Sequence, residues 1–347
     1  MNAIPTDPRA TRMHAEIGET SVAIARQRAA NAKPLAALVQ ALRATPPRFV
    51  ATAARGSSDN AATYAKYLIE TRLGLTTSSA APSVHSVYAA HPDMSDALFL
   101  AISQSGRSPD LLRQCAAAKR SGARVVALVN VVDSPLAEIA DTVLPLHAGP
   151  ELSVAATKSY LCSLAAIADL VAQWCGDAVL DAALGALPRT LDAANDFDWS
   201  ALINDLADAR NLFVVGRGLG LSAAQEAALK LKETCGLHAE AFSAAEVQHG
   251  PMALVERDFP VLFFTQPDDT LASTLEVANS FRVRGAHVHV ARADATPGDL
   301  AFAATTHPAC ATIAAVHAFY HAANALAVRR GRNPDLPPHL RKVTETV

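Results

Sequence analysis

The sequence predicts an α/β protein with two tandem domains, each built on a doubly wound parallel sheet. Short apolar runs alternate with helical patterns, which is typical of parallel strands joined by right-handed helical crossovers. The second half of the chain also repeats landmarks of the first at an offset of 162 or 163 residues: Arg55 and Arg217, Ser103 and Thr265, and Gly122 and Gly285. Three pairs at nearly one spacing indicate that a single domain was duplicated.

The elements of the first half follow in order from these patterns. Apolar runs predict four strands, at residues 48–54, 96–103, 121–130 and 142–146. A helix is predicted over 59–74 from the spacing of four residues, Ala61, Tyr64, Ala65 and Leu68. A second helix is predicted from Pro109 to about Arg120.

The second half repeats this order. Strands are predicted at residues 211–216, 259–265 and 284–290, and the helices between them end near Cys235 and Val283. Residues 186–202 are interpreted as the connector. We therefore expect three parts: an N-terminal helical segment over 1–34, a first domain over 35–195, and a second domain over 196–347 that includes a C-terminal tail.

The composition disfavours several classes of protein. Half of the 347 residues are hydrophobic and 18% are charged, so large cores can be buried. A net charge of −3 without a cluster of lysine or arginine disfavours nucleic acid as a partner. Five scattered cysteines without a C-x-x-C pair are typical of a reducing cytosol rather than of disulfides or zinc.

No targeting or membrane segment is expected. The N-terminus has charges and prolines where a signal peptide needs an apolar core. We expect no later run of 18 apolar residues that lacks charges, and therefore no membrane-spanning helix. The protein is therefore predicted to be soluble and cytoplasmic, with no membrane partner.

Two turns of the first half are candidates for anion binding. Ligands of parallel sheets bind beyond the carboxyl ends of the strands, where the chain carries Gly56, Ser57 and Ser58 and, in the next turn, Ser103, Gln104, Ser105 and Ser108. Each turn precedes a helix whose free N–H groups and dipole favour an anion, and hydroxyls without lysines suit a phosphate monoester. A single serine there more often caps its helix, so capping and phosphate binding both stay open.

Other ligands are disfavoured. The turn "GRGLGL" from Gly216 lacks the third glycine of G-x-G-x-x-G, no acidic residue ends the next strand, and Walker-type "GKS" or "GKT" is absent. The histidine pairs of the second half, His287 with His289 and His317 with His321, have no third ligand. We therefore predict neither a cofactor nor a metal.

The helix ending near Cys235 carries candidate acid–base groups. Glu226, Lys230 and Glu233 fall on one helical face. A solvated face is the commoner interpretation, but this helix begins at a crossover turn. A lysine beside carboxylates can form a Schiff base, a carboxylate can move a proton between adjacent carbons, and a histidine such as His249 can protonate a ring oxygen. Residues 238–254 around His249 are polar and are not predicted as a buried element.

Five ordered segments resemble the sugar isomerase (SIS) domain family: "RGSSDNAATYAKYLIE", "SQSGRSPDLL", "AGPELSVAATKSY", "EAALKLKETCGLHAEAFSAAEVQHGPMAL" and "PPHLRKVTE". The closest likeness is to the isomerase half of glucosamine-6-phosphate synthase and to stand-alone glucosamine-6-phosphate deaminases. The resemblance implies two flavodoxin-like SIS domains in a homodimer that needs no cofactor and acts on a small phosphosugar.

The resemblance also implies roles for individual residues. The phosphate loop matches Ser103, Gln104, Ser105 and Ser108, and the neighbouring turn contacts the sugar through Ser57 and Ser58. Val154 and Ala155 line the site with their backbone. Glu233 moves a proton between C1 and C2, and His249, supplied by the partner subunit, opens the ring. Lys230 and Glu226 match the lysine and carboxylate of the same helix, and Lys342 matches the lysine of the closing tail.

Two departures from the synthase pattern favour a deaminase. Asn2 follows Met1 where a synthase would begin a glutaminase domain with cysteine, so no ammonia source is expected. Arg55 replaces the cysteine of the synthase "CGTS" turn. We expect conversion of glucosamine 6-phosphate and water to fructose 6-phosphate and ammonia, with Lys230 or Lys342 as candidates for assisting imine hydrolysis.

Two alternatives stay open at this point. One is another phosphosugar enzyme of the same fold, such as a fructosamine-6-phosphate deglycase or a galactosamine- or tagatose-phosphate deaminase or isomerase. The other is a non-catalytic phosphosugar-sensing module. The sensing module is disfavoured because the residues before the first domain are too few and not basic enough for a DNA-binding segment, and because Glu233 and His249 are both present.

Overall fold

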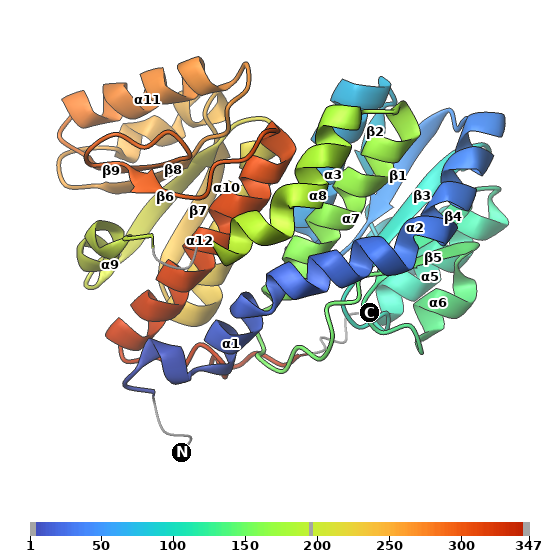
Figure 1. Ribbon diagram of the computed structural model, residues 1–347, viewed down its shortest axis with the longest axis horizontal. Coiled ribbons are helices and arrows are strands. Elements are labelled where there is room, and N and C mark those ends of the chain that lie inside the picture. Colours follow the sequence, from blue (N-terminus) through green and yellow to red (C-terminus); the bar gives the residue numbers. More distant parts are fainter. Residues whose placement is uncertain (1–4, 194–196, 343–347) are drawn as a thin grey trace. The chain divides into compact units, whose positions relative to one another are not determined.

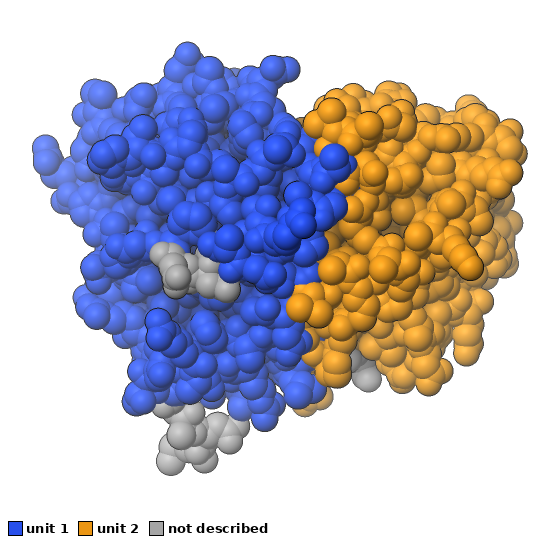
Figure 2. Space-filling model, viewed as in Figure 1, with its two compact units in different colours: residues 1–21, 151–157, 182–340 blue, residues 22–150, 158–181, 341–347 orange. Residues whose placement is uncertain are grey.

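The structure is a computed structural model that describes residues 5–193 and 197–342 (Figure 1). The chain forms two compact units, coloured separately in Figure 2. Unit 1 comprises Met1–Ser21, Glu151–Thr157 and Ala182–Leu340, and unit 2 comprises Val22–Pro150, Lys158–Asp181 and the chain from Arg341. Each unit contains one five-stranded parallel sheet.

The sheet of unit 2 has the order β2-β1-β3-β4-β5. Its strands are β1 (Phe49–Ala53), β2 (Thr77–Ser79), β3 (Ala97–Ser103), β4 (Arg124–Val129) and β5 (Thr142–Pro145). The helices of this half are α2 (Thr20–Ala44), α3 (Ser57–Leu73), α4 (Ser83–Ser86), α5 (Pro109–Arg120), α6 (Pro135–Ile139) and α7 (Lys158–Cys175). Because both faces of the sheet are covered, β3 is buried at every residue, as apolar parallel strands require.

The sheet of unit 1 has the order β10-β9-β8-β6-β7. Its strands are β6 (Asn211–Gly216), β7 (His238–Ser243), β8 (Pro260–Phe264), β9 (His287–Arg292) and β10 (Leu300–Ala301). Its helices are η1 (Pro8–Ala10), α1 (Arg12–Gly18), α9 (Ser200–Leu206), α10 (Leu219–Cys235), η2 (Glu246–Gln248), η3 (Pro251–Leu254), α11 (Leu271–Val283) and α12 (Pro308–Arg329). Helix α8 (Ala178–Asp192) contributes residues to both units.

The two sheets repeat one topology, which confirms the predicted pair of tandem doubly wound domains. Taken in chain order, the strands of both sheets follow the pattern 2-1-3-4-5. The first helix after the first strand is 17 residues long in each case. Each begins at a glycine of nearly identical conformation, Gly56 at φ 56° and ψ −132° and Gly218 at φ 58° and ψ −128°. Only glycine adopts such angles readily, so the turn and its glycine were duplicated together.

The predicted strands and helices are confirmed, but the sequence analysis missed several others. Strand β7 lies in the polar stretch that was not predicted as a buried element. An edge strand needs only one buried face, and β7 alternates between exposed His238, buried Ala239 and exposed Glu240. The region interpreted as the connector begins within helix α8, which runs to Asp192 and buries Leu187 and Leu191.

Helix α12 departs from the expectation about membrane segments. Its length and apolar composition are sufficient to cross a membrane, although 83% of its most apolar window is buried within the protein. Phe319 packs against Trp199 and Phe264, so this helix forms part of the core of unit 1. Packing within unit 1 therefore accounts for its apolar residues.

Three histidines meet where α1 packs on α12. The ring centroids of His317 and His321 lie 5.1 Å apart, and those of His14 and His321 lie 5.4 Å apart. Burial lowers the pKa of His317 to about 4, despite a hydrogen bond with the backbone of Ile17. Burial and the neighbouring histidines lower the pKa of His321 to about 3. His317 and His321 are therefore both neutral at pH 7.

This cluster predicts a loss of stability in acid. An unfolded histidine takes up a proton below about pH 6.5, whereas folded His317 does so only near pH 4. The contribution of His317 to the free energy of unfolding is therefore fully present above pH 6.5. It falls as the pH drops, by roughly 3 kcal/mol at pH 4. We expect His317→Leu to reduce this pH dependence, measured as urea unfolding free energies at pH 7 and pH 4.5. An unchanged dependence would contradict the assignment.

Candidate active site

The switch point of the first sheet brings the two hydroxyl-rich turns together. In the order β2-β1-β3-β4-β5, connections leave in opposite directions after β1 and β3, which opens a crevice at their carboxyl ends. The two strands pair in register, with Phe49 opposite Ala97 and Ala53 opposite Ala101. The turn from Gly56 and the turn from Ser103 therefore leave neighbouring strands side by side.

The turn after β3 is held by its own serines. The Ser103 hydroxyl accepts a hydrogen bond from the Gly106 N–H at 3.0 Å, and the Ser105 hydroxyl accepts one from the Arg107 N–H at 3.3 Å. Gly106 has φ +64°, and a Cβ atom there would lie 2.3 Å from the Ser134 hydroxyl. The turn thus requires glycine for both its conformation and its packing.

The capping interpretation of the serines is not supported at these helices. Ser108 is the N-cap of α5, yet its side chain makes no capping hydrogen bond. Helix α3 begins after Gly56, which has no side chain to cap with. Gln104, Ser105 and Ser108 are half-buried, so their polar groups stay within reach of a ligand, while Ser57 and Ser103 are buried.

An ion pair links the two turns. Arg55, just before Gly56, donates from Nε at 2.8 Å and from Nη2 at 2.6 Å to Oδ2 of Asp110 in the first turn of α5. The Asp110 side chain is only 1% exposed. Arg55 therefore balances the negative charge of a buried carboxylate beside the predicted phosphate turn.

The carboxylates and lysine of α10 form a buried cluster in unit 1. The side chains of Lys230 and Glu226 are 1% and 0% exposed, and Lys230 Nζ lies 3.6 Å from Glu226 Oε1. Lys230 also pairs directly with Glu233, whose side chain is 22% exposed. The hydroxyl of Tyr320 donates to Glu226 at 2.8 Å. The solvated-face interpretation was therefore wrong for Glu226 and Lys230.

Lys230 is held in its charged form. Burial by itself would lower its pKa, but Glu226, Glu233 and Glu151 outweigh burial and raise the pKa of Lys230 above its ordinary value. A protonated amine is not a nucleophile, so this arrangement suits electrostatic support of Glu233 rather than Schiff-base formation. Of the cluster, Glu233 is the member that retains exposed surface.

The segment that carries Val154 and Ala155 belongs to the same unit. Glu16 of α1 accepts hydrogen bonds from the backbone N–H groups of Leu152 at 2.5 Å and Ser153 at 3.2 Å. The N–H of Val154 donates to the carbonyl of Asp335 at 3.1 Å. Glu151 is buried and accepts from the N–H of Thr157 at 3.0 Å. Sequence reasoning missed Glu16, Tyr320 and Asp335 because their partners lie far away in the chain, and it missed Glu151 because the lysine that Glu151 affects, Lys230, is equally distant.

In the equivalent turn of the second sheet, the side chain of Asp268 accepts the hydrogen bonds that the turn offers. One oxygen of Asp268 accepts from the N–H of Thr270 at 2.9 Å and from its hydroxyl at 2.6 Å, and the other accepts from Gln266 at 3.0 Å. Gln266 also donates to the carbonyl of Arg217 in the turn after β6. A carboxylate of the chain itself therefore takes the donors that this turn presents.

Two predicted site residues lie outside these groups. His249 is exposed at the end of η2, and no hydrogen bond or ion pair within the described residues joins its ring to Lys230 or Glu233. Lys342, the last described residue, is half-buried and is grouped with unit 2. Across residues 5–193 and 197–342, no group of three or more His, Cys, Asp or Glu side chains is arranged to hold a metal ion.

Comparison with known proteins identifies the class. The SIS domain model matches residues 47–172 and 205–328. The glutamine–fructose-6-phosphate aminotransferase (isomerizing) of Thermus thermophilus is 35% identical over 312 residues, which cover 83% of this chain and 50% of that enzyme. The chain thus spans about half the length of the curated relatives it matches. The chain belongs to the SIS domain family.

Solved structures agree with this assignment. A protein of Silicibacter pomeroyi provisionally described as a phosphosugar isomerase is 44% identical, with a TM-score of 0.89 over 94% of this chain and 100% of that chain. The glucosamine-6-phosphate deaminase of Thermotoga maritima superposes with a TM-score of 0.77 over 97% of this chain and 100% of that chain. At 22% identity the deaminase shows a shared fold alone.

Proposed function

We propose that this protein is an aminosugar-phosphate deaminase that converts glucosamine 6-phosphate and water to fructose 6-phosphate and ammonia in the cytoplasm. The observation that carries the proposal is the cluster on α10. A buried, charged Lys230 pairs with Glu233, and Glu233 alone among the cluster keeps exposed surface. Such a carboxylate suits proton transfer between adjacent sugar carbons. This chain has Arg55 where synthases have a cysteine, and that difference favours a deaminase over a synthase.

In this proposal the first sheet's turns hold the phosphate. Gln104, Ser105 and Ser108, with Ser103 shaping the turn, offer hydroxyl, amide and backbone N–H donors next to the start of α5. Ser57 and Ser58 at the start of α3 contact the sugar, and the backbone of Val154 and Ala155 lines the site. Compact hydroxyl donors match a phosphate monoester better than a nucleotide.

The acid–base groups carry out the chemistry in three steps. His249 of the partner subunit assists ring opening. Glu233 removes the proton from C2 to give an enolamine and returns it to C1, which leaves an imine at C2. Water then adds to C2 and ammonia leaves, giving the ketone. The raised pKa of Lys230 favours Lys342 over Lys230 as the amine that assists the last step.

The proposal is tested by measuring products. Purified protein is incubated with glucosamine 6-phosphate, galactosamine 6-phosphate and fructosamine 6-phosphate, and ammonia and sugar phosphates are quantified. We expect equal amounts of ammonia and fructose 6-phosphate from glucosamine 6-phosphate. Glucose 6-phosphate released from fructosamine 6-phosphate would identify a deglycase instead. Binding of these sugars without turnover of any would identify a sensing module.

Arg55 is expected to support phosphate binding by neutralising Asp110. Arg55→Ala removes the ion pair to the buried Asp110 carboxylate beside the phosphate turn, so the Kd for fructose 6-phosphate should rise roughly tenfold or more. The double variant Arg55→Ala/Asp110→Asn should recover most of this loss, measured by isothermal titration calorimetry. A double variant as weak as the single one would show that Arg55 does not act through Asp110.

The homodimer is tested by subunit complementation. If His249 acts in the partner's site, His249→Ala and Glu233→Gln homodimers are both inactive, but a mixed dimer contains one site with both groups intact. Equal mixing after dissociation should restore about a quarter of the wild-type activity, because half of the dimers are mixed and each has one complete site. No recovery, with mixed dimers verified, would show that both residues act from one chain.

A further inference from the structure

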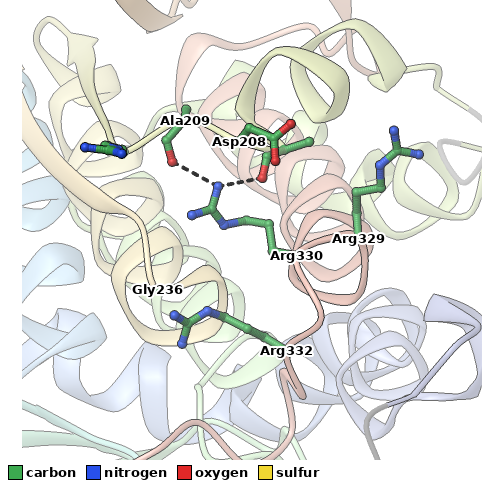
Figure 3. Close-up of a pocket in the computed structure, with 8 residues that line it drawn as sticks. Asp208, Ala209, Gly236, Arg329, Arg330 and Arg332 are labelled. Atoms are coloured by element: carbon green, nitrogen blue, oxygen red, sulfur yellow. Dashed lines mark hydrogen bonds between the residues drawn. The ribbon is translucent and has the colours of Figure 1, made fainter.

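A cavity in unit 1, whose lining residues are drawn in Figure 3, lies at the amino end of strand β6. Its volume is about 560 Å³, and it is lined by Ala207, Asp208, Ala209, Arg210, Gly236, Arg329, Arg330 and Arg332. Residues 207–210 lead into the first residue of β6, whereas the crevice lies beyond the last residue of that strand. The cavity is therefore separate from the turns assigned to the substrate.

The cavity concentrates positive charge. Four guanidinium groups line it, against the single carboxylate of Asp208. In the described part of the chain, no hydrogen bond or ion pair engages the guanidinium groups of Arg210, Arg329 or Arg332. Like charges gathered in one depression repel each other unless an anion lies between them.

Hydrogen bonds to helix C-terminal carbonyls account for the position of only one of these arginines, Arg330. Arg330, at the end of α12, donates to the carbonyls of Leu206, Ala207, Ala209 and Cys235 at 2.7 to 3.0 Å. Figure 3 shows its side chain reaching from the helix toward the carbonyl of Ala209. Such contacts satisfy helix C-terminal carbonyls, for which a cation is suited. They leave the other three arginines unexplained.

Arg332 is positioned by a neighbouring glycine. A Cβ atom on Gly236 would lie 2.1 Å from the Arg332 guanidinium carbon, so the guanidinium lies directly against the backbone where α10 ends. Figure 3 shows Arg332 beside Gly236. Arg330 is tied to four carbonyls, so one guanidinium group of the cavity is held in place before any ligand binds, which reduces the entropic cost of binding.

We propose that this cavity binds a phosphorylated small molecule that carries at least two negative charges. Arginine presents planar pairs of donors that match phosphate oxygens, and several arginines together select multiply charged anions. The volume is in the range of small-molecule sites and is larger than a single phosphate needs. A net chain charge of −3 argues that this positive pocket is a local feature rather than part of a broadly basic surface.

Calorimetric titration of the full chain with pyrophosphate tests the site without relying on turnover. Wild-type protein should bind pyrophosphate, and Arg332→Gln and Arg210→Gln should each weaken binding roughly tenfold or more. Arg189→Gln is the matched control, because Arg189 is an exposed arginine near the end of α8 in the same unit. It should bind as the wild type does. Thermal melting verifies that each variant is folded.

A further variant separates this cavity from the substrate turns. Ser105→Ala/Ser108→Ala alters the phosphate turn of the first sheet and should leave the arginine-dependent pyrophosphate binding intact. Absence of binding to wild-type protein would overturn the proposal. Binding that is lost in the serine variant but kept in both arginine variants would overturn it as well, because the anion would then occupy the substrate turns.

Discussion

Glu233→Gln is expected to lower kcat on glucosamine 6-phosphate at least about 100-fold, with KM nearly unchanged. Glutamine keeps the shape of the side chain and can still accept a hydrogen bond from Lys230, but it cannot take up the proton from C2. The loss therefore falls on the chemical step rather than on binding. Steady-state kinetics with continuous ammonia detection measures both constants.

The matched control for this variant is Glu276→Gln. Glu276 is an exposed glutamate on α11 of the same unit, away from the cluster. It should turn over substrate like the wild type. Full turnover by Glu233→Gln would remove the proton-transfer role, and a large rise in KM at unchanged kcat would assign Glu233 to substrate binding instead.

Lys230→Met is expected to destabilise the fold by about 3–5 kcal/mol. The substitution removes the buried cation whose charge balances those of the buried carboxylates of Glu226 and Glu151. Because the cost arises from ionised carboxylates, it should shrink as the pH falls and the buried carboxyls become protonated. Urea unfolding at pH 7.5 and pH 5 measures the difference.

Two further variants test this explanation. Lys230→Met/Glu226→Gln should recover a large part of the lost stability, because one buried charge is removed together with its partner. Lys232→Met changes an exposed lysine of the same helix and should stay within about 0.5 kcal/mol of the wild type. Equal stability of Lys230→Met and wild-type protein would show that the carboxylates are neutral in the fold.

The sequence predicted the central strands of both sheets and the edge strand β5, but it missed the other edge strands, β2, β7 and β10. The central strands are apolar throughout, so β3 and β8 stand out from the surrounding pattern. Strand β2 has only three residues, with two of them exposed, and β7 alternates with polar residues. Edge strands are completed by hydrogen bonds to a neighbour, and that pairing leaves little trace in the local sequence.

The site was predicted for residues close together in the chain and missed where distant segments meet. The spacing of Glu226, Lys230 and Glu233 already indicated a shared helical face. The burial of that face depends on α12, which supplies Tyr320, and on the segment that supplies Glu151. The residues around Lys230 have the hydropathy of a solvated helix. The burial of Lys230 could therefore not be predicted from the local sequence.

The occupied crevice of the second sheet has a consequence for binding stoichiometry. Gly106 of the first crevice and Asp268 of the second lie at the same 162-residue offset as Ser103 and Thr265. Where the first turn has a glycine with no side chain, the second has a carboxylate that already takes the donors of Thr270 and Gln266. The duplicated fold supplies two crevices, but the turn of the second carries a carboxylate that already accepts from its own donors, so we expect these crevices to bind one anion per chain.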